Sequence, residues 1–268
     1  MKQKSVILVT LFFLFLIGCS KAVKIEETIQ QSISKYDGVI VFSDLKSDNI
    51  IYSNKTKASE AYPPCSTFKI WNTLIGIEKG LINSPNEEFY KWDKEVRFIP
   101  EWNKDLNFKE AFKVSCVPAF QELAKKIGSI FMQDWINKIN YGDKNISSGI
   151  DIFWLPREGK KSLLITPEQQ ALLIKELVNK KLSFSDKALN ILKKVMLVKQ
   201  TDKGTLFGKT GSGKNVNDIP NNNIGWFVGY IVSEKGSYSF ACIIKGENFA
   251  GKDAKAIIEK ILTDTDFL

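Results

Sequence analysis

A serine and a lysine stand three positions apart at Ser66 and Lys69, where a segment with apolar residues at helical spacing begins. Residues three apart lie on one face of a helix, so the hydroxyl and the amine can come within hydrogen-bond distance. The unpaired backbone N–H groups and the positive dipole end at a helix start favour a developing oxyanion. Burial beside Phe68 and Trp71 would lower the pKa of the lysine and make its neutral amine available as a base. The same residues also fit a helix cap followed by a surface lysine, so this pattern does not decide alone.

A second group of polar residues, the Lys-Thr-Gly at Lys209–Gly211, follows a strand candidate at 205–207. At a sheet edge it would offer a cation, a hydroxyl and a glycine backbone that lets a ligand lie close, although it also fits a strand that ends in a turn. A Ser-Cys-Val at Ser115–Val117 lies between the two groups in the sequence. The order Ser-x-x-Lys, Ser-x-x, Lys-Thr-Gly is the motif order of β-lactamases and penicillin-binding proteins. Three patterns that are weak alone are therefore strong together.

The chain contains no histidine. This excludes a Ser-His-Asp triad, a Cys-His pair and any zinc site that uses histidine. If the protein is a hydrolase, its base must be a carboxylate or a lysine with a lowered pKa.

The elements that must position these residues change type along the chain. Strands are predicted near both ends, as a hairpin at 38–43 and 49–52 and as three strands at 204–210, 225–232 and 238–245. Helices are predicted at 25–33, 66–80, 118–127, from 167, at 186–198 and at 254–262. Thr166 is the predicted N-cap of the helix from 167, with Gln169 closing a capping box.

This layout predicts an α+β fold of two lobes. Both termini complete one antiparallel sheet flanked by helices, and a helical lobe at about 66–200 packs against it. A substrate site is expected in the cleft between the lobes. Residues 19–268 are predicted to form a single catalytic domain, because the length of the chain, 268 residues, and its 44% hydrophobic content suffice for one large core.

Residues 1–18 are predicted to be an export signal. Two lysines precede an apolar stretch at 6–17 that is too short for a confident membrane span. The sequence Leu-Ile-Gly before Cys19 resembles the lipobox of bacterial lipoproteins, which predicts lipidation of Cys19 and a lipid anchor on a bacterial membrane. Ordinary cleavage near Gly18 or Ser20, with the cysteine incidental, is the alternative.

The formal net charge of +8 comes almost entirely from scattered lysines, with arginine only at Arg97 and Arg157. Nucleic-acid binding requires a clustered basic patch, so we predict a solvated surface and no nucleic-acid partner. Past the signal, Cys65, Cys116 and Cys242 form an odd set without a disulfide framework. A Cys65–Cys116 bridge and small buried thiols both stay open.

Beyond the shared motif order, several segments are similar to the class D, oxacillinase-type β-lactamases. Val117, where class A enzymes carry asparagine, is the discriminating residue. The resemblance runs from about residue 38 to the C-terminus. The matching segments are Ser66–Lys69, Ser115-x-Val117, Tyr141-Gly142, Phe153–Leu155, Lys209–Gly211 and Trp226-x-x-Gly229.

The resemblance implies hydrolysis of a small-molecule β-lactam through an acyl-enzyme on Ser66. It implies that Lys69 is carboxylated by CO2, needs no other cofactor and acts as the general base. An amine must be neutral to attack CO2, which requires the apolar pocket that Val117 helps to form. By the same similarity, the indole N–H of Trp154 donates to the carbamate, although Trp154 would equally fit a core position.

The remaining roles are also implied by the resemblance. Ser115 and Lys209 would relay a proton to the β-lactam nitrogen. The backbone N–H groups of Ser66 and Ser212 would form the oxyanion hole. Thr210, beside Gly211, would contact the substrate carboxylate, and no metal ion is implied.

Two positions depart from the family pattern. The usual Tyr-Gly-Asn ends in Asp143 here, which a structural turn tolerates. The family also binds the substrate carboxylate with an arginine on or before the last helix, and no arginine follows Arg157. Lys252 or Lys255 is expected to replace it as a point charge without the bidentate fork.

Two other functions share the motif order. A penicillin-sensing receptor acylates in the same way, but such receptors carry several membrane spans and a metalloprotease segment. A peptidoglycan transpeptidase or carboxypeptidase acylates but reacts slowly with water, and Val117 and Trp154 disfavour it. Fast turnover separates both from a β-lactamase.

Overall fold

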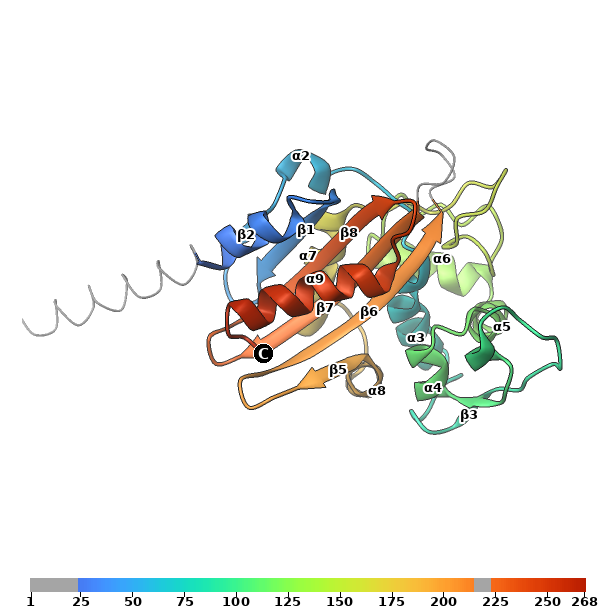
Figure 1. Ribbon diagram of the computed structural model, residues 1–268. Helices are drawn as coiled ribbons and strands as arrows, with labels where there is room; N and C mark the ends of the chain where they lie inside the picture. The colour runs from blue at the N-terminus through green and yellow to red at the C-terminus, as the bar shows by residue number, and fades with distance from the viewer. Residues whose placement is uncertain (1–23, 215–222) are drawn as a thin grey trace, which may run out of the picture.

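The computed structural model describes residues 24–214 and 223–268. The predicted signal and Cys19 lie outside these residues. The centre of the fold is a six-stranded antiparallel sheet with the order β2-β1-β8-β7-β6-β5 (Figure 1). Its strands are β1 (Asp37–Asp44), β2 (Ile50–Tyr52), β5 (Leu197–Gln200), β6 (Gly204–Lys214), β7 (Asn223–Ser233) and β8 (Gly236–Gly246).

The two ends of the chain complete this sheet together, as predicted. β1 pairs with β8 along its whole length, from Asp37 opposite Lys245 to Asp44 opposite Tyr238. Successive side chains of a strand point to opposite faces, and here both faces are covered. Val41 therefore packs into the core on the side of the helical lobe, whereas Phe42 packs into the core on the opposite side.

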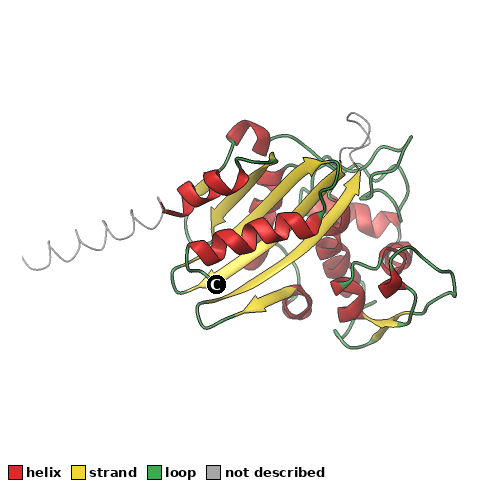
Figure 2. Cartoon of the chain, in the orientation of Figure 1, coloured by secondary structure: helices red, strands yellow, loops and turns green. Residues whose placement is uncertain are grey.

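Two helices from opposite ends of the chain cover one face of the sheet. They are the helix at 24–33 and α9 (Gly251–Asp264), which lie in front of the sheet in Figure 2. Ile29 and Ile258 are fully buried beneath them and belong to one core cluster. The predicted helices at both termini are therefore confirmed.

The other face carries the helical lobe, where α7 packs directly on β1 and β8. This lobe supports the nucleophile segment and the Ser115 segment. Its helices are α3 (Lys69–Glu78), α4 (Phe108–Lys113), α5 (Val117–Ile127), α6 (Ser129–Lys138), α7 (Pro167–Val178) and α8 (Asp186–Met196), with the short α2 (Lys55–Ala58) before them.

Sequence patterns did not predict the helices α2, α4 and α6 or several short strands. Helix α8 ends at Met196 rather than at Val198, because the next residues turn and pair with β6 as the edge strand β5. A small two-stranded sheet of β3 (Glu88–Tyr90) and β4 (Leu106–Asn107) lies in the helical lobe. Strands of two to four residues are too short for a period to show.

The N-cap of α7 is confirmed, but its capping box is not. The Thr166 side chain accepts a hydrogen bond from the Gln169 backbone N–H at 3.1 Å. The Gln169 side chain does not return to the cap. It accepts from Gly142 N at 3.1 Å and donates to Asn140 O at 2.6 Å, because a tight turn there leaves backbone groups that need partners.

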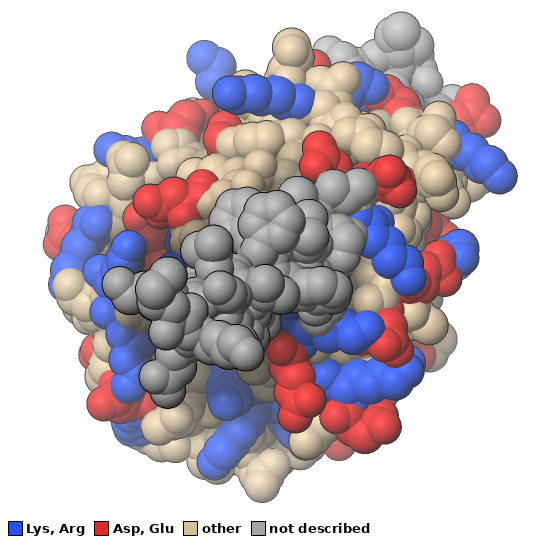
Figure 3. Space-filling model, turned by 90° about the vertical axis from the view of Figure 1, so that its left-hand side faces the viewer, with Lys and Arg blue, Asp and Glu red and all other residues tan. Residues whose placement is uncertain are grey.

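The surface carries both signs of charge together. On the face shown in Figure 3, lysines and acidic residues alternate rather than separating into patches. Among residues 24–214 and 223–268, no helix has the length and apolar character needed to cross a membrane.

Candidate active site

Ser66 and Lys69 lie at the junction of a 3-10 turn and α3. The turn, η1 (Cys65–Phe68), leads directly into the helix. The Lys69 Nζ donates to the Ser66 Oγ at 2.7 Å. Ser66 is 7% exposed and Lys69 is fully buried. The structure thus brings the predicted nucleophile and base into direct contact, in a tighter turn than a regular helix.

Burial lowers the pKa of Lys69 to about 7, against an ordinary value of 10.5. The Lys69 Nζ lies 5.3 Å from the centroid of the Phe120 ring. Cys116 and Cys65 lie near this amine, and both are buried free thiols rather than a bridge. Because burial raises the pKa of Cys65 to about 12, that thiol is neutral at physiological pH and the amine faces no buried anion there.

Lys209 and Ser115 form a second contact at the same site. The Lys209 Nζ donates to the Ser115 Oγ and, at 3.1 Å, to Thr210 O. Lys209 is 4% exposed, and burial, followed by the nearby charge of Lys69, holds its pKa well below the ordinary value. Ser115 has a φ of +55°, a conformation that costs a non-glycine residue energy. In this conformation its hydroxyl meets the Lys209 amine.

Strand β6 lies against the nucleophile turn because Gly211 has no side chain. A Cβ at Gly211 would lie 3.0 Å from Pro64 O and 3.1 Å from Thr67 Cγ2. Trp226 on the neighbouring strand donates from its indole to Pro63 O at 2.9 Å. The backbone of β6 at Gly211 therefore runs directly beside the nucleophile turn.

The next residue of β6, Ser212, is also held in place. Its Oγ accepts from the backbone N–H of Gly251 at the start of α9, at 2.9 Å. The two residues predicted to form the oxyanion hole, Ser66 and Ser212, thus lie on backbone segments that pack together.

Trp154 belongs to an aromatic group beneath the nucleophile turn. Its ring stacks on Phe68 with centroids 5.9 Å apart and meets Phe153 edge-on at 5.0 Å. Trp154 is fully buried, and its Nε1 has no hydrogen-bond partner among the described residues. Val117 is half-buried at the first turn of α5. A buried indole donor without a partner is destabilising unless an acceptor is supplied.

The Tyr141–Asp143 turn is held by close packing and by hydrogen bonds. A Cβ at Gly142 would lie 2.2 Å from Leu164 O, and its φ of +55° also favours glycine. The Asp143 Oδ1 accepts from the backbone N–H groups of Asn145 and Leu164, both at 3.1 Å. These are acceptor contacts that an aspartate makes as well as an asparagine, so the departure from the family pattern is structural and minor.

A cationic cavity of about 270 Å³ opens at the part of β6 that β5 does not cover. Its wall contains Lys209 and Thr210 from β6 and Lys255 from α9. Lys109 and Lys113 of α4 also line this cavity, and none of its described lining residues is a carboxylate. Lys252 is exposed and lies outside this lining. Of the two predicted replacements for the arginine, the structure therefore places Lys255 beside Thr210.

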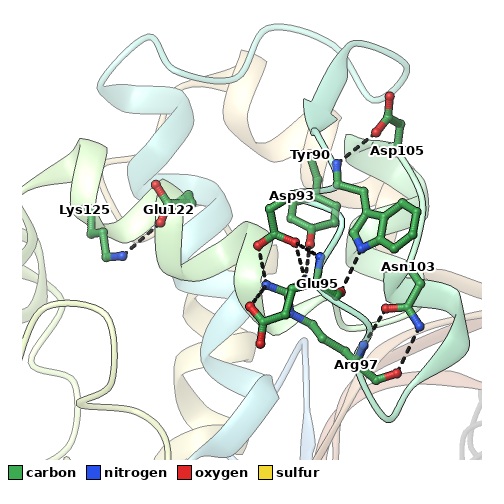
Figure 4. A network of polar contacts seen from close by, with 9 residues as sticks. Tyr90, Asp93, Glu95, Arg97, Asn103, Asp105, Glu122 and Lys125 are labelled. Carbon is green, nitrogen blue, oxygen red and sulfur yellow. Dashed lines mark hydrogen bonds and ion pairs between the residues drawn. The ribbon is translucent and has the colours of Figure 1, made fainter.

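Arg97 is engaged elsewhere, in the loop after β3 (Figure 4). Its Nη1 and Nη2 donate to the two carboxylate oxygens of Asp93 at 2.7 and 2.6 Å. Its backbone pairs with the Asn103 side chain. The same loop ends at Trp102, whose indole donates to Val114 O at 3.0 Å, next to Ser115. Arg97 thus stabilises a loop that adjoins the site.

Sequence patterns missed two residues that shape the site. Phe120 lies under the Lys69 amine, although its spacing of three from Val117 on one helical face could have indicated it. Gln170 is buried and donates to Thr67 Oγ1 at 2.9 Å. No local pattern distinguishes Gln170 from a surface glutamine. Among the described residues, no cluster of three or more carboxylates, cysteines or histidines could hold a metal ion.

A serine beside a buried lysine of lowered pKa, with a Ser–Lys pair at the same site and a strand backbone alongside, defines a serine-lysine acyl-transfer enzyme. The family model described as the penicillin binding protein transpeptidase domain matches residues 35–263. The chain is 34% identical over 228 residues to the probable β-lactamase YbxI of Bacillus subtilis, covering 84% of this chain and 80% of that protein. It is 36% identical over 211 residues to β-lactamase OXA-10 of Pseudomonas aeruginosa, covering 78% and 77%.

Solved structures agree with the sequence comparisons. The crystal structure of FUS-1 (OXA-85), a class D β-lactamase from Fusobacterium nucleatum subsp. polymorphum, matches with a TM-score of 0.81 and 35% identity. The match covers 90% of this chain and 98% of that one. The chain therefore belongs to the class D serine β-lactamases, within the penicillin-binding-protein transpeptidase family.

Proposed function

We propose that the protein hydrolyses the β-lactam ring of penicillin-type antibiotics through an acyl-enzyme on Ser66, with carboxylated Lys69 as the general base, and so confers antibiotic resistance. The observation that supports this most strongly is the fully buried Lys69 amine, 2.7 Å from the Ser66 hydroxyl. Family membership supports the reaction class.

Carboxylation of Lys69 is consistent with its surroundings. The lone pair of the neutral amine attacks the carbon of CO2, one C–O π pair moves to oxygen, and the nitrogen releases a proton. A pKa of about 7 leaves a substantial neutral fraction at physiological pH. The unpaired Trp154 indole N–H fits the resulting anion. Once bound, CO2 supplies a carboxylate base that a lysine alone lacks.

Each step then uses residues of the site. Carboxylated Lys69 takes the Ser66 proton as the Oγ attacks the β-lactam carbonyl. The backbone N–H groups of Ser66 and Ser212 stabilise the oxyanion, an interaction that contributes about 3 kcal/mol per donor in other enzymes. Lys209 and Ser115, already in contact, relay this proton from carboxylated Lys69 to the leaving nitrogen, which restores the base. Lys69 then activates the water that hydrolyses the ester and frees Ser66.

The test is turnover of a chromogenic cephalosporin by the purified protein, with and without added bicarbonate. Multiple turnovers that bicarbonate stimulates, and their loss in Lys69→Ala, are the expected result. A single stoichiometric burst that is insensitive to bicarbonate and leaves Ser66 acylated would instead identify a sensor or transpeptidase.

We also propose that Lys255 binds the substrate carboxylate with Thr210. Lys255→Ala should raise KM by about tenfold, the effect of losing one charge-assisted hydrogen bond, with kcat changed less. Steady-state kinetics on a penicillin measures this split. Lys252→Ala is the matched control on the same helix, outside the cavity. Equal KM values for the Lys255→Ala variant and the parent would refute the assignment.

For localisation, we propose export followed by lipidation of Cys19. The short apolar segment that ends in Leu-Ile-Gly-Cys supports it. Cells fed a labelled fatty acid should incorporate the label into the parent protein and not into Cys19→Ala. Label in both proteins would contradict the proposal.

A further inference from the structure

Two polar side chains are buried one turn beyond Lys69 on α3. Asn72 and Thr73 are both fully inaccessible to solvent. Neither the Nδ2 nor the Oδ1 of Asn72 has a hydrogen-bond partner among the described residues, and the same holds for the Thr73 Oγ1. A buried amide with both ends unpaired is destabilising, so native proteins rarely keep one without a reason.

These side chains share a helical face with Lys69. Positions 69, 72, 73 and 76 recur at the spacing of one face. That face is directed at α5, because a Cβ at Gly76 would lie 3.0 Å from Leu123 Cδ1 and the Lys69 Nζ lies 5.3 Å from the Phe120 ring. The α5 surface opposite is apolar. It therefore offers the Asn72 amide no partner.

Helix geometry places the Asn72 side chain over the helical turn that contains the start of the Lys69 side chain. Side chains in an α-helix lean toward its N-terminus and cover the turn before them. For Asn72 that turn begins at Lys69. The two unpaired residues differ in one respect: a buried threonine hydroxyl can rotate to donate to the carbonyl four residues earlier in its own helix, whereas an asparagine amide has no such local partner.

We infer that Asn72 is a positioning residue for the carboxylated form of Lys69, its Nδ2–H donating to a carbamate oxygen and its Oδ1 accepting from the carbamate N–H. The inference rests on the proposed function. A carbamate presents an N–H and two oxygens, which is the complement of an amide plus the Trp154 indole. The apolar α5 face leaves the Asn72 amide unpaired, and the carbamate that CO2 forms on Lys69 supplies the missing hydrogen-bond partners.

Carboxylation itself is the quantity to measure, by ¹³C NMR of the full-length protein titrated with ¹³C-bicarbonate. Asn72→Leu keeps the approximate volume and removes both polar ends. The bicarbonate concentration at half-carboxylation should rise about tenfold in this variant, the usual effect of losing a buried hydrogen bond to an anion. Its kcat should recover at saturating bicarbonate, which a general packing defect would not allow.

Two further variants make the test specific. Thr73→Val removes an equally buried oxygen from the same face and should keep the parental bicarbonate dependence. Asn72→Asp keeps the shape of the side chain but replaces its donor by an anion, so it should lose carboxylation at least as strongly as Asn72→Leu. It also serves if Asn72→Leu does not fold.

Thermal unfolding gives an independent readout. Bicarbonate should raise the midpoint temperature of unfolding of the parent protein, because a ligand that binds only the folded state stabilises that state. The rise should be smaller in Asn72→Leu. A folded Asn72 variant with the parental carboxylation curve would overturn the inference alone. Absence of a carbamate signal in the parent would overturn the proposed base and the inference together.

Discussion

The burial of Lys69 has opposite effects on chemistry and on stability. A neutral amine is what attack on CO2 requires, and burial supplies it by lowering the pKa to about 7. The unfolded chain, in which the lysine has its ordinary pKa, binds the proton more tightly. Folding at neutral or lower pH must therefore either release that proton or bury a charge.

The sign of this effect can be measured with Lys69→Met. Between pH 7 and 10.5 the unfolded parent binds more protons than the folded parent, so parental stability rises with pH across this range. Below pH 7 the full penalty applies, at about 5 kcal/mol as an upper figure. In CO2-free buffer, urea unfolding should show Lys69→Met more stable than the parent at pH 6, with the difference vanishing near pH 10.5. A difference that does not change with pH would contradict the burial of a neutral amine.

Trp154 supports a prediction about the second half-reaction. Trp154→Phe retains an aromatic ring beside Phe68 but removes the unpaired indole N–H together with part of the ring. Without that donor the base is less well held, so deacylation should slow by at least about tenfold. Mass spectrometry should then find the acyl-enzyme during turnover. Phe153→Leu is the control, because it alters the same aromatic group without removing a donor.

At the scale of elements, the site depends on the approach of β6 to the nucleophile turn. Gly211 permits this approach. The positions of its neighbours Thr210 and Ser212 at the site depend on the same approach. Most of the other candidate residues lie at the start of an element or just before one: Ser66 in η1, Lys69 at the start of α3, Ser115 before α5. The geometry of the catalytic residues is therefore set at the ends of these elements rather than by any one helix.

Gly211→Ala should disturb this arrangement. The added Cβ would lie 3.0 Å from Pro64 O, so β6 or the turn must shift by a few tenths of an ångström. We expect a loss of about 1–3 kcal/mol in the free energy of unfolding, together with slower acylation in stopped-flow measurements. Gly128→Ala, at a positive φ in open space, should lose about 1 kcal/mol and keep the parental acylation rate.

The elements differ in how far sequence could predict them. Strands β1, β7 and β8 were predictable because β-branched and aromatic residues recur through them. Strand β6 contains four glycines and was predicted only as far as Thr210. Strand β5 was not, since Leu197 and Val198 continue the apolar period of α8 and only the pairing with β6 separates them. Motif order located Ser66, Lys69, Ser115 and Lys209, and the resemblance to class D β-lactamases implied their roles. Phe120 could have been found from its helical spacing, whereas Gln170 is defined by a contact with a distant segment, which no local pattern contains.

At the scale of the whole molecule, two cores flank the sheet and serve different ends. The core on the helical side contains Phe68, Trp154 and Tyr141, and so continues directly into the site. The core beneath the helix at 24–33 and α9 contains no candidate site residue. Its effect on the reaction is indirect, through α9, whose first residue Gly251 holds Ser212 and whose Lys255 reaches the cavity.

The pairing of β1 with β8 has a consequence for how this protein is made. On the ribosome, β1 emerges early and its neighbour emerges almost last, so the central sheet cannot assemble until translation is nearly complete. Every residue proposed to act directly in the hydrolysis, from Ser66 to Ser212, has been synthesised by then. A premature stop codon after Ser212 would therefore yield a truncated chain that contains the residues proposed to act directly but lacks Lys255 and the complete sheet, so it would be open to aggregation and proteolysis.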